Sequence, residues 1–468
     1  MTLSSFLDST SLGIFFYFVF VQSFYIFLLI MAVPEIVRRY REVRYENWDR
    51  LLFSDSAPQV TIIVPAYNEE KCIVFTVNNL LHLTYRYKEI IIVNDGSKDN
   101  TLEVLKKTFH LFPVPPRIPP LLKTQRVRNY YRSQEYPNLV VVDKENGGKV
   151  DSNNAGVNVC TSAFFLIIDA DTIVLDQTIQ SLIRPFFMSK NMIATGGSIG
   201  IVNGCELRGN RIVKIHFPRQ WITAIQVIEY LRAFFMGRQG WNRMGGCMLI
   251  SGAFGLFDKK KVVEIGGYQR EIGDDVDLVF RLHARMREKK EKYEIRMIPD
   301  LCAMTEAPFT WDALGNQRER WQRGLIATLW DNKKMMFNPR YGLNGMLCYP
   351  YFAIIEAISP IIESLGYVTV LFSFLFGYLN AYAALWFLLL ALGFPMFLTL
   401  FVILLQYISF QWYFSFADTC KMVLCAVLEQ LGYRQYLVFY RLLAFYKWMK
   451  GECSWKKIER EGFKDKKL

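Results

Sequence analysis

FFLIIDADTIVLD, residues 164–176, is the stretch that decides the fold. Its apolar residues, Phe164 to Ile168, lead directly into Asp169-Ala170-Asp171. An apolar run of this length, rich in aromatic and β-branched residues, is typical of a buried strand in a parallel sheet. Ligands of open α/β sheets bind just beyond the carboxyl ends of the strands. The stretch therefore predicts an α/β fold with two carboxylates at its ligand-binding edge.

The two carboxylates indicate a divalent cation. Asp169 and Asp171 would repel each other at this edge unless a cation lay between them and an anionic group. Mg²⁺ typically takes one or two carboxylates and completes its octahedron with water and substrate phosphates. We therefore expect Mg²⁺ or Mn²⁺ beside a phosphate-bearing substrate. The alternative for an isolated Asp-x-Asp is a turn that happens to hold two aspartates.

Apolar runs near both ends of the chain predict membrane crossings. Residues 12–33 carry no charge and are long enough for a helix to cross a bilayer. The run lacks the basic leader and cleavage site of a signal peptide, so we expect it to be retained. A second apolar block predicts two more crossings, at about 350–378 and 382–408, with a turn near residues 377–380.

The distribution of charge around these runs predicts the orientation. Only Asp8 precedes the first run, whereas Arg38, Arg39, Arg41 and Arg44 follow it. The positive-inside rule then places the N-terminus outside and the following chain in the cytoplasm. Residues 418–450 are apolar but repeatedly charged, which favours interfacial helices over a fourth crossing, the alternative. The expected organisation is a membrane helix with a basic juxtamembrane segment (1–50), a cytoplasmic α/β domain (51–330), membrane and interfacial helices (331–450) and a basic cytoplasmic tail (451–468).

Composition excludes several classes of protein. The net charge of +12 is better explained by anionic lipid headgroups and an anionic substrate than by nucleic acid, because membrane runs are present. Nine cysteines without a CxxC pair and four scattered histidines give no readable zinc site or disulfide framework. The glycine-rich segment NGGK, residues 146–149, lacks a Walker pattern, which excludes a P-loop.

Strands and helices alternate in the middle of the chain, as in a mostly parallel α/β sheet. Residues 60–65 and 89–93 are predicted strands, and Asp95 follows the second of them. A carboxylate there accepts hydrogen bonds from a nucleotide base or ribose, or alternatively only caps the next helix. Residues 110–134 interrupt the alternation with five prolines and are expected to form a solvated loop. Lys149, after two glycines that let the backbone approach a ligand, supplies charge for a phosphate.

Two further motifs lie later in this region. LISGAFGLF, residues 249–257, suits close packing behind a sugar ring, and an ordinary buried strand with glycine bends is the alternative. Asp274 and Asp275 begin a helix that runs to about Lys289, where acidic residues are often only capping residues.

The last motif, QRERW, lies in a helical stretch over residues 312–329. Gln317, Arg320 and Trp321 share one helical face. A guanidinium group grips phosphate oxygens, and an indole face stacks on a sugar ring. The alternative is an amphipathic interfacial helix.

Together the motifs PAYNEE, VNDGSKDNT, NGGK, DAD, SGAFGLF, GDDVDL and QRERW resemble those of membrane-integrated family 2 glycosyltransferases, the group of cellulose, hyaluronan and poly-N-acetylglucosamine synthases. The resemblance covers residues 60–324. It implies a GT-A-type domain that binds a nucleotide-diphosphosugar, inverting transfer from a UDP-sugar, and a place in a bacterial cytoplasmic membrane.

The resemblance also implies roles for individual residues. Tyr67, Glu69 and Asp95 would hold uracil and ribose, with Lys149 on the nucleotide side. Asp169 would meet the nucleotide-sugar, and Asp171 would bind the metal together with Asp169. Asp275 matches the general base of the family's Thr-Glu-Asp or Gly-Glu-Asp motif, whereas Asp274 stands where Glu is expected. Gln317 and Arg320 would face the diphosphate. Trp321 would stack beneath the acceptor sugar, and Ser251, Gly252 and Asp274 would also contact the acceptor.

These roles define an expected reaction. Asp275 would take a proton from an acceptor hydroxyl, while the cation at Asp171 and the side chain of Arg320 would stabilise the departing UDP. The QxxRW pattern is the family's mark of repeated addition, so we expect a processive synthase that adds sugars of the glucose or N-acetylglucosamine class to a β-linked polysaccharide. The alternatives are a non-processive enzyme with a lipid-linked acceptor and an inactive scaffold or export subunit.

Two acidic residues in the second apolar block concern export of the product. Glu356 and Glu363 are seven residues apart and share a helical face. Carboxylates within a membrane segment are functional candidates by default. They would line a polymer path or hold a partner subunit. The alternative is that residues 346–360 form an interfacial helix.

Overall fold

The computed structural model describes residues 3–45, 57–116, 119–252, 254–270, 272–378, 381–410, 412 and 415–452. The tail from Cys453 onward, residues 46–50 and the turn residues 379–380 therefore lie outside the described residues. The chain divides into two compact units. Of the described residues, the helical unit comprises those within 3–37, 219–244 and 308–452, and the sheet unit comprises those within 38–218 and 245–307.

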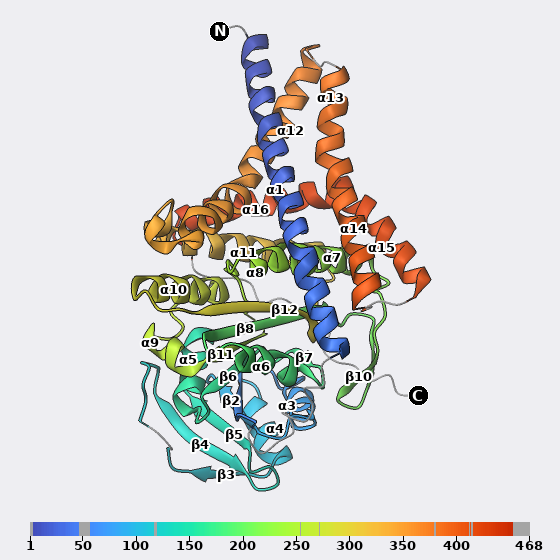
Figure 1. The fold of residues 1–468 in the computed structure, drawn as a ribbon. Helices are drawn as coiled ribbons and strands as arrows, with labels where there is room; N and C mark the ends of the chain where they lie inside the picture. Colours follow the sequence, from blue (N-terminus) through green and yellow to red (C-terminus); the bar gives the residue numbers. More distant parts are fainter. Residues whose placement is uncertain are drawn as a thin grey trace. The chain divides into compact units, whose positions relative to one another are not determined.

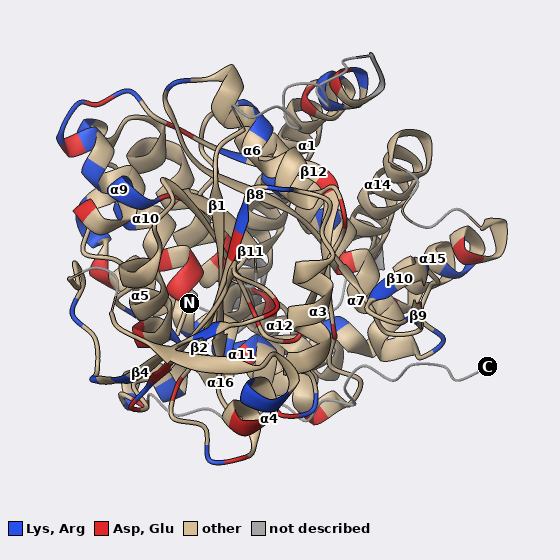
Figure 2. Ribbon diagram, turned by 90° about the horizontal axis from the view of Figure 1, so that it is seen from below, with Lys and Arg blue, Asp and Glu red and all other residues tan. Residues whose placement is uncertain are grey.

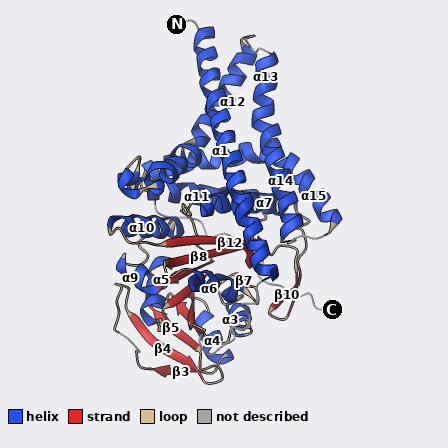
Figure 3. Ribbon diagram, viewed as in Figure 1, coloured by secondary structure: helices blue, strands red, loops and turns tan. Residues whose placement is uncertain are grey.

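A ten-stranded sheet forms the centre of the sheet unit (Figure 1). Its strand order is β3-β4-β5-β2-β1-β6-β11-β8-β12-β7. The strands are β1 (Val60–Ala66), β2 (Lys88–Asn94), β3 (Leu111–Val114), β4 (Val127–Ser133), β5 (Leu139–Lys144), β6 (Phe164–Ile168), β7 (Thr172–Val174), β8 (Met192–Ile201), β11 (Phe254–Asp258) and β12 (Glu294–Thr305). A separate hairpin joins β9 (Glu206–Arg208) to β10 (Arg211–Lys214). Figure 3 shows that the strands are gathered in this unit.

The sheet is mixed, with a parallel centre. Strands β5, β2, β1 and β6 run parallel to one another, and β12 runs parallel to β8. β11 is antiparallel to both β6 and β8. The central strands β2 and β5 are buried almost throughout, because helices cover a parallel sheet on both faces. The α/β class predicted from residues 164–176 is confirmed.

Helices of the sheet unit connect these strands. They are α3 (Ile73–Leu81), α4 (Thr101–Thr108), α5 (Lys149–Val159), α6 (Thr178–Met188), α9 (Lys259–Glu264) and α10 (Asp274–Glu288). Helix α5 packs on β1 and β2, and α6 packs on β8 and β12. Helices α9 and α10 carry charges of both signs (Figure 2).

The segment 110–134 differs from the expected loop. It contains β3 and β4, which pair antiparallel at the edge of the sheet. Pro113 lies within β3, the outermost strand, where a missing backbone N–H costs no ladder hydrogen bond. The prolines therefore mark an edge rather than the absence of strands.

The helical unit contains most of helix α1 (Leu3–Tyr45) and the chain's later helices. These are α7 (Trp221–Leu231), η1 (Arg232–Arg238), α8 (Gln239–Arg243), α11 (Trp311–Asp331), η2 (Lys333–Met335), η3 (Pro339–Tyr341), η4 (Asn344–Cys348), η5 (Tyr351–Ala357), α12 (Ser359–Leu375), α13 (Ala381–Leu388), η6 (Leu389–Gly393), α14 (Phe394–Ser409), α15 (Phe416–Leu428), η7 (Glu429–Tyr433) and α16 (Arg434–Met449). Among the described residues, three stretches are long and apolar enough to cross a membrane: Ser9–Val43, Asn344–Leu375 and Ala384–Ser409.

The division differs from the bounds of the expected domain 51–330 at three segments. Residues 38–45 already belong to the sheet unit. Residues 219–244 and the stretch from Pro308 onward, including α11, belong to the helical unit. Helix α11 packs on α16, and α7 packs on α15. Packing between helices that are far apart in the chain cannot be predicted from local sequence patterns.

Candidate active site

Parallel strands bring several of the predicted site residues to one edge of the sheet. Strand β1 pairs in parallel with β2 and with β6, so the carboxyl ends of all three lie at the same edge. Tyr67 follows β1, Asp95 follows β2, and Asp169 follows β6. This edge is where open α/β sheets bind their ligands.

Lys149 joins three motifs at this edge. It is the first residue of α5, and its Nζ lies 2.7 Å from Asp169 Oδ1. The same ammonium lies 3.7 Å from Asp274 Oδ2 and donates a hydrogen bond of 3.2 Å to the carbonyl oxygen of Gly252. The side chains of Lys149 and Asp169 are each about a third exposed, so a ligand can reach both. The structure thus brings NGGK, DAD, SGA and GDD together.

Asp275 lies beside Gly252. Its Oδ2 accepts a hydrogen bond of 2.9 Å from the Gly252 N–H, and its Oδ1 accepts one of 2.9 Å from the Val276 N–H. A Cβ at position 252 would come within 3.0 Å of the Asp275 Cβ, so glycine permits this close approach. Each carboxylate oxygen keeps a further lone pair for an acceptor hydroxyl. Ser251 precedes this contact and is half-buried.

Asp169 and Asp171 fit a magnesium-type ion. They flank the end of β6, where Asp169 is partly exposed and Asp171 is buried. Within the described ranges, no group of three or more Asp, Glu, His or Cys residues could hold a metal. Mg²⁺ does not require one, because substrate phosphates and water supply its other ligands. The donor set therefore suits an ion that arrives with a phosphate-bearing substrate.

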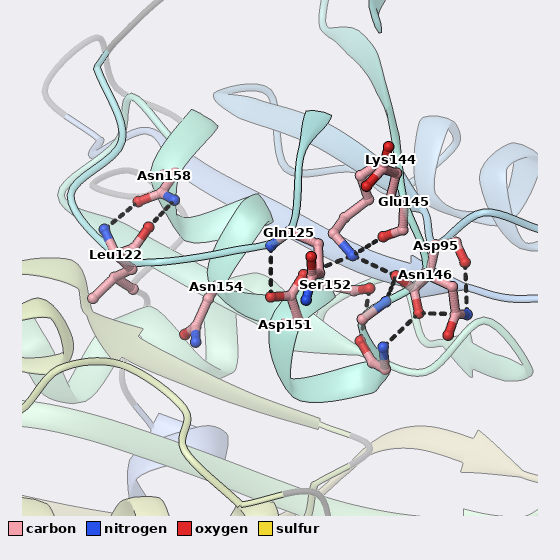
Figure 4. A network of polar contacts seen from close by, with 12 residues as sticks. Asp95, Leu122, Gln125, Lys144, Glu145, Asn146, Asp151, Ser152, Asn154 and Asn158 are labelled. Atoms are coloured by element: carbon pink, nitrogen blue, oxygen red, sulfur yellow. Dashed lines mark hydrogen bonds and ion pairs between the residues drawn. The ribbon is translucent and has the colours of Figure 1, made fainter. Parts of the chain in front are cut away.

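Asp95 has a role that the sequence did not indicate. Its Oδ1 accepts hydrogen bonds from Lys144 Nζ and the Gly147 N–H, and its Oδ2 accepts from Asn146 Nδ2 and the Gly148 N–H (Figure 4). A carboxylate has about four acceptor sites, and four donors of the chain already occupy them. The residue is also buried. Its expected contact with uracil would have to displace one of these donors.

Tyr67 and Glu69 lie in the loop after β1, which the first residue of α4 helps to hold in place. The Glu69 N–H donates to Thr101 Oγ1 at 2.9 Å, and Glu69 Oε2 accepts from the thiol of Cys72 at 3.0 Å. The Tyr67 side chain is exposed, so its ring is available to a nucleotide base.

Gln317, Arg320 and Trp321 lie on α11, in the helical unit. The N-terminus of α11 is capped by Thr310, whose Oγ1 accepts from the Ala313 N–H. Gln317 and Arg320 are half-buried, and the Trp321 ring is exposed. The exposed ring is suited to stacking on a sugar.

Arg318 supports the tryptophan and was not among the predicted site residues. Its guanidinium carbon lies 4.4 Å from the centre of the Trp321 ring, a cation–π contact, and its Nη2 donates to Glu229 Oε2. The Tyr433 hydroxyl donates to the same oxygen at 2.8 Å. Burial raises the pKa of the Glu229 carboxyl, and the charge of Arg318 opposes that shift. The first arginine of QRERW could have suggested this partner only if α7 had been known to pack nearby.

Comparisons with known proteins identify the family of the chain. Residues 61–251 match the family model "Glycosyl transferase family 2", and residues 164–419 match "Glycosyl transferase family group 2". The poly-beta-1,6-N-acetyl-D-glucosamine synthase of Staphylococcus aureus (strain COL) is 29% identical over 287 residues, which cover 61% of this chain and 59% of that protein. The enzyme of the same name from Staphylococcus epidermidis is 26% identical over 336 residues, covering 67% of this chain and 71% of that protein.

The chain thus spans about three fifths of the length of the Staphylococcus aureus relative. Among solved structures, the mannosyltransferase PcManGT from Pyrobaculum calidifontis, in complex with GDP-Man and Mn²⁺, aligns with a TM-score of 0.48 and 16% identity. That alignment covers 88% of this chain and 99% of the mannosyltransferase.

Proposed function

We propose that this chain, which belongs to glycosyl transferase family group 2, transfers a sugar from a UDP-sugar to the end of a growing β-linked polysaccharide by an inverting, metal-dependent reaction. The observation that carries the proposal is the connection of Asp275 through Gly252 to Lys149 and Asp169. It places a candidate base and a candidate donor-binding pair around one glycine. N-acetylglucosamine is the favoured sugar, because the relatives are named as synthases of its β-1,6-linked polymer.

Asp275 acts as the general base in this proposal. Its carboxylate takes the proton of the acceptor hydroxyl while the oxygen of that hydroxyl forms a bond to the anomeric carbon. The bond from that carbon to the diphosphate oxygen breaks, and UDP leaves from the opposite face. Attack opposite to the leaving group converts an α-linked donor into a β-linked product. The hydrogen bonds from the Gly252 and Val276 N–H groups hold the carboxylate in place for this step.

The negative charge that develops on UDP needs positive partners. Lys149 lies where it can contact the donor, and Asp169 and Asp171 would hold Mg²⁺ or Mn²⁺, which would neutralise diphosphate charge. Asp274, paired with Lys149, lies on the acceptor side with Ser251 and Gly252. We assign Tyr67 and Glu69 to the nucleotide.

The helical unit is proposed to serve the acceptor and the diphosphate. Gln317 and Arg320 would face the diphosphate, and the exposed ring of Trp321 would stack on the acceptor sugar. Because Arg318 holds the Trp321 ring in place, each new terminal sugar would stack on the same surface, which suits repeated addition. Processive synthesis is therefore the proposed mode.

We propose that the sheet unit lies in the cytoplasm and that the stretches Ser9–Val43, Asn344–Leu375 and Ala384–Ser409 cross the membrane, with the N-terminus outside. Helices α15 and α16 are then interfacial. The arginines after residue 37 are the basis of this orientation. Labelling of single cysteines introduced at the N-terminus and in the β9–β10 hairpin, from either side of sealed vesicles, tests it. Labelling of both from the same side would contradict it.

The reaction is tested with the full chain in lipid nanodiscs. Radiolabelled UDP-N-acetylglucosamine and UDP-glucose are supplied separately with Mn²⁺, and UDP release and product size are measured. We expect a long polymer from UDP-N-acetylglucosamine. Products of one or a few sugars extracted with lipid would instead identify a non-processive enzyme with a lipid-linked acceptor. The absence of UDP release with every UDP-sugar would favour a scaffold or export subunit. Asp258→Asn, which keeps a good cap on α9, is the control for Asp275→Asn.

A further inference from the structure

We propose that Lys144 is a positioning residue of the donor site, because its buried pair with Asp95 holds the turn that presents Lys149. The inference deepens the proposed function and rests on it, since Lys149 is assigned there to the UDP-sugar. Figure 4 shows the network, which extends from the end of β2 to the first turn of α5. Lys144 belongs to none of the motifs that define the candidate site.

The side chain of Lys144 is completely buried and surrounded by oxygen atoms. Its Nζ donates hydrogen bonds to Asp95 Oδ1 and to the Glu145 carbonyl oxygen. It also lies 2.6 Å from Asp151 Oδ1, an ion pair. An ammonium group has three protons, and three oxygen atoms surround this one. With no exposed surface, Lys144 cannot itself reach a diphosphate, so its effect must pass through its partners.

Asp95 transmits the effect to the turn Asn146-Gly147-Gly148. The two N–H groups of Gly147 and Gly148 each donate to a different oxygen of the carboxylate at 2.9 Å. Asn146 Nδ2 adds bonds to the Asp95 carbonyl oxygen and to Oδ2. One buried carboxylate therefore fixes the backbone of the whole turn. Its negative charge is balanced by Lys144 and by the N-terminus of α5, which favours anions.

Asp151 fixes the other side of the turn. A Cβ at Gly147 would lie 2.7 Å from the Asp151 Cγ, so the backbone and this carboxylate are in close contact. Asp151 Oδ2 accepts from the Gln125 N–H at 2.9 Å, which ties the segment before β4 to α5. Farther along α5, Asn158 accepts from the Leu121 and Leu122 N–H groups. The turn is thus held between two buried or half-buried acids that share one lysine.

Lys149 follows the turn directly, so the turn sets where its side chain begins. Removing the charge of Lys144 would leave Asp95 and Asp151 close together without a cation between them. The repulsion between the acids would loosen the N–H bonds of Gly147 and Gly148, and Lys149 would lose its fixed position near Asp169. The expected consequence is weaker donor binding by a protein that is still folded.

The test uses Lys144→Met in the full chain, with Lys88→Met as the matched control. Lys88 is a partly buried lysine at the opposite end of the neighbouring strand β2, where it donates to the Leu83 and Tyr85 carbonyl oxygens. Two quantities are measured: amide hydrogen exchange of the Gly147–Gly148 peptide without ligand, and the Kd of UDP with Mn²⁺. For Lys144→Met we expect the exchange rate and the Kd each to rise about tenfold or more, since the loss of one charged hydrogen bond corresponds to a factor of this size. For Lys88→Met neither should change, even if the thermal midpoint falls.

Two further variants keep the test decisive. Lys144→Arg retains the charge and should recover part of the UDP affinity. Asn146→Ala removes only the exposed donor to Asp95 and should raise exchange and Kd in the same direction, even if Lys144→Met fails to fold. Unchanged exchange and Kd in Lys144→Met, or in Asn146→Ala if the first variant does not fold, would overturn the proposal. If the wild-type chain binds no UDP, the proposed function fails, while the exchange measurement still reports on the turn.

Discussion

Lys149 Nζ lies 2.7 Å from Asp169 Oδ1, which joins the first residue of α5 to the carboxylate that follows β6. The same ammonium is 3.7 Å from Asp274 Oδ2. Without a ligand, this lysine therefore neutralises acids from two motifs at once. An arriving diphosphate would compete for the lysine and release Asp169 for the ion that accompanies the donor.

We expect Lys149→Met to raise the KM for the UDP-sugar by a larger factor than it lowers kcat. The variant loses the cation for the diphosphate and leaves Asp169 and Asp274 facing each other. A lost charged hydrogen bond predicts a rise in KM of about 10- to 100-fold. Steady-state UDP release measures both parameters. A KM equal to that of the wild-type chain would show that Lys149 does not contact the donor.

Asp275→Asn should abolish transfer while UDP binding persists. The amide oxygen of asparagine can still accept the hydrogen bond from the Gly252 N–H, although the bond from the Val276 N–H is lost, but it cannot take a proton. General-base catalysis contributes about 10²- to 10⁴-fold, which is the expected loss in kcat. Turnover and UDP affinity are measured on the same preparation, beside Asp258→Asn. Normal elongation by Asp275→Asn would refute the base assignment.

Removal of divalent ions should stop the reaction. Chelation is expected to abolish UDP release, and Mg²⁺ or Mn²⁺ should restore it, because the departing diphosphate needs the ion's charge. Asp171→Asn should shift the activating metal concentration upward by about tenfold or more, since it removes a charged ligand. A metal titration of turnover gives this value. Full activity in the presence of chelator would rule out the metal site.

Glu363 is predicted to stabilise the helical unit rather than to line a polymer path. It is buried on α12 and accepts hydrogen bonds from Arg434 Nε at 2.8 Å and from the Tyr367 hydroxyl. Glu363→Gln breaks this pair and should lower stability by about 1–3 kcal/mol. Glu356→Gln, which loses only the charge facing the Tyr351 hydroxyl, should cost less. Thermal unfolding in nanodiscs gives both values. Unchanged stability of Glu363→Gln, with polymer retained inside vesicles, would restore the path hypothesis.

Stability should fall in acid because of His283. Burial lowers the pKa of this histidine from 6.5 to about 4, and the neutral ring is held between the Tyr293 hydroxyl and the Cys247 carbonyl oxygen. The unfolded chain takes up a proton below pH 6.5, whereas the folded chain does so only near pH 4. The contribution of neutral His283 to the free energy of unfolding is therefore complete above pH 6.5. It is lost as the pH falls, and the total loss is on the order of 3 kcal/mol.

The thermal midpoint, measured between pH 7 and pH 5, checks this. His283→Gln should be less stable at pH 7 but should show a smaller decrease over this interval. Equal slopes for the two proteins would contradict the assignment to His283.

The fold class and several site residues could be predicted because they depend on local pattern. The apolar run before Asp169 predicted a strand, and parallel pairing then necessarily placed its end beside the ends of β1 and β2. Lys149 and Asp274 could be named as candidates from their motifs. Their distance could not, because it depends on how α5 and α10 pack.

The features that the sequence did not reveal depend on long-range packing. The prolines of residues 110–134 suggested a loop, yet this segment pairs with β5 through β4. The four donors around Asp95 come from residues about fifty positions away, so the sequence did not indicate them, and the contact of Asp95 with the nucleotide stays a prediction. Arg318 contacts the Trp321 ring directly, and its partner Glu229 lies on a distant helix, so the sequence did not indicate this pair.

The sequence by itself determined the α/β class, the apolar segments and the family, because periodicity, hydropathy and short motifs are properties of neighbouring residues. Tertiary structure alone decided that Lys144 is buried between two acids, that Lys149 pairs with Asp169, and that α11 belongs to the helical unit. The physical reason is that hydrogen bonds and ion pairs require distances near 3 Å. Such distances between residues far apart in the chain exist only after the strands and helices have packed.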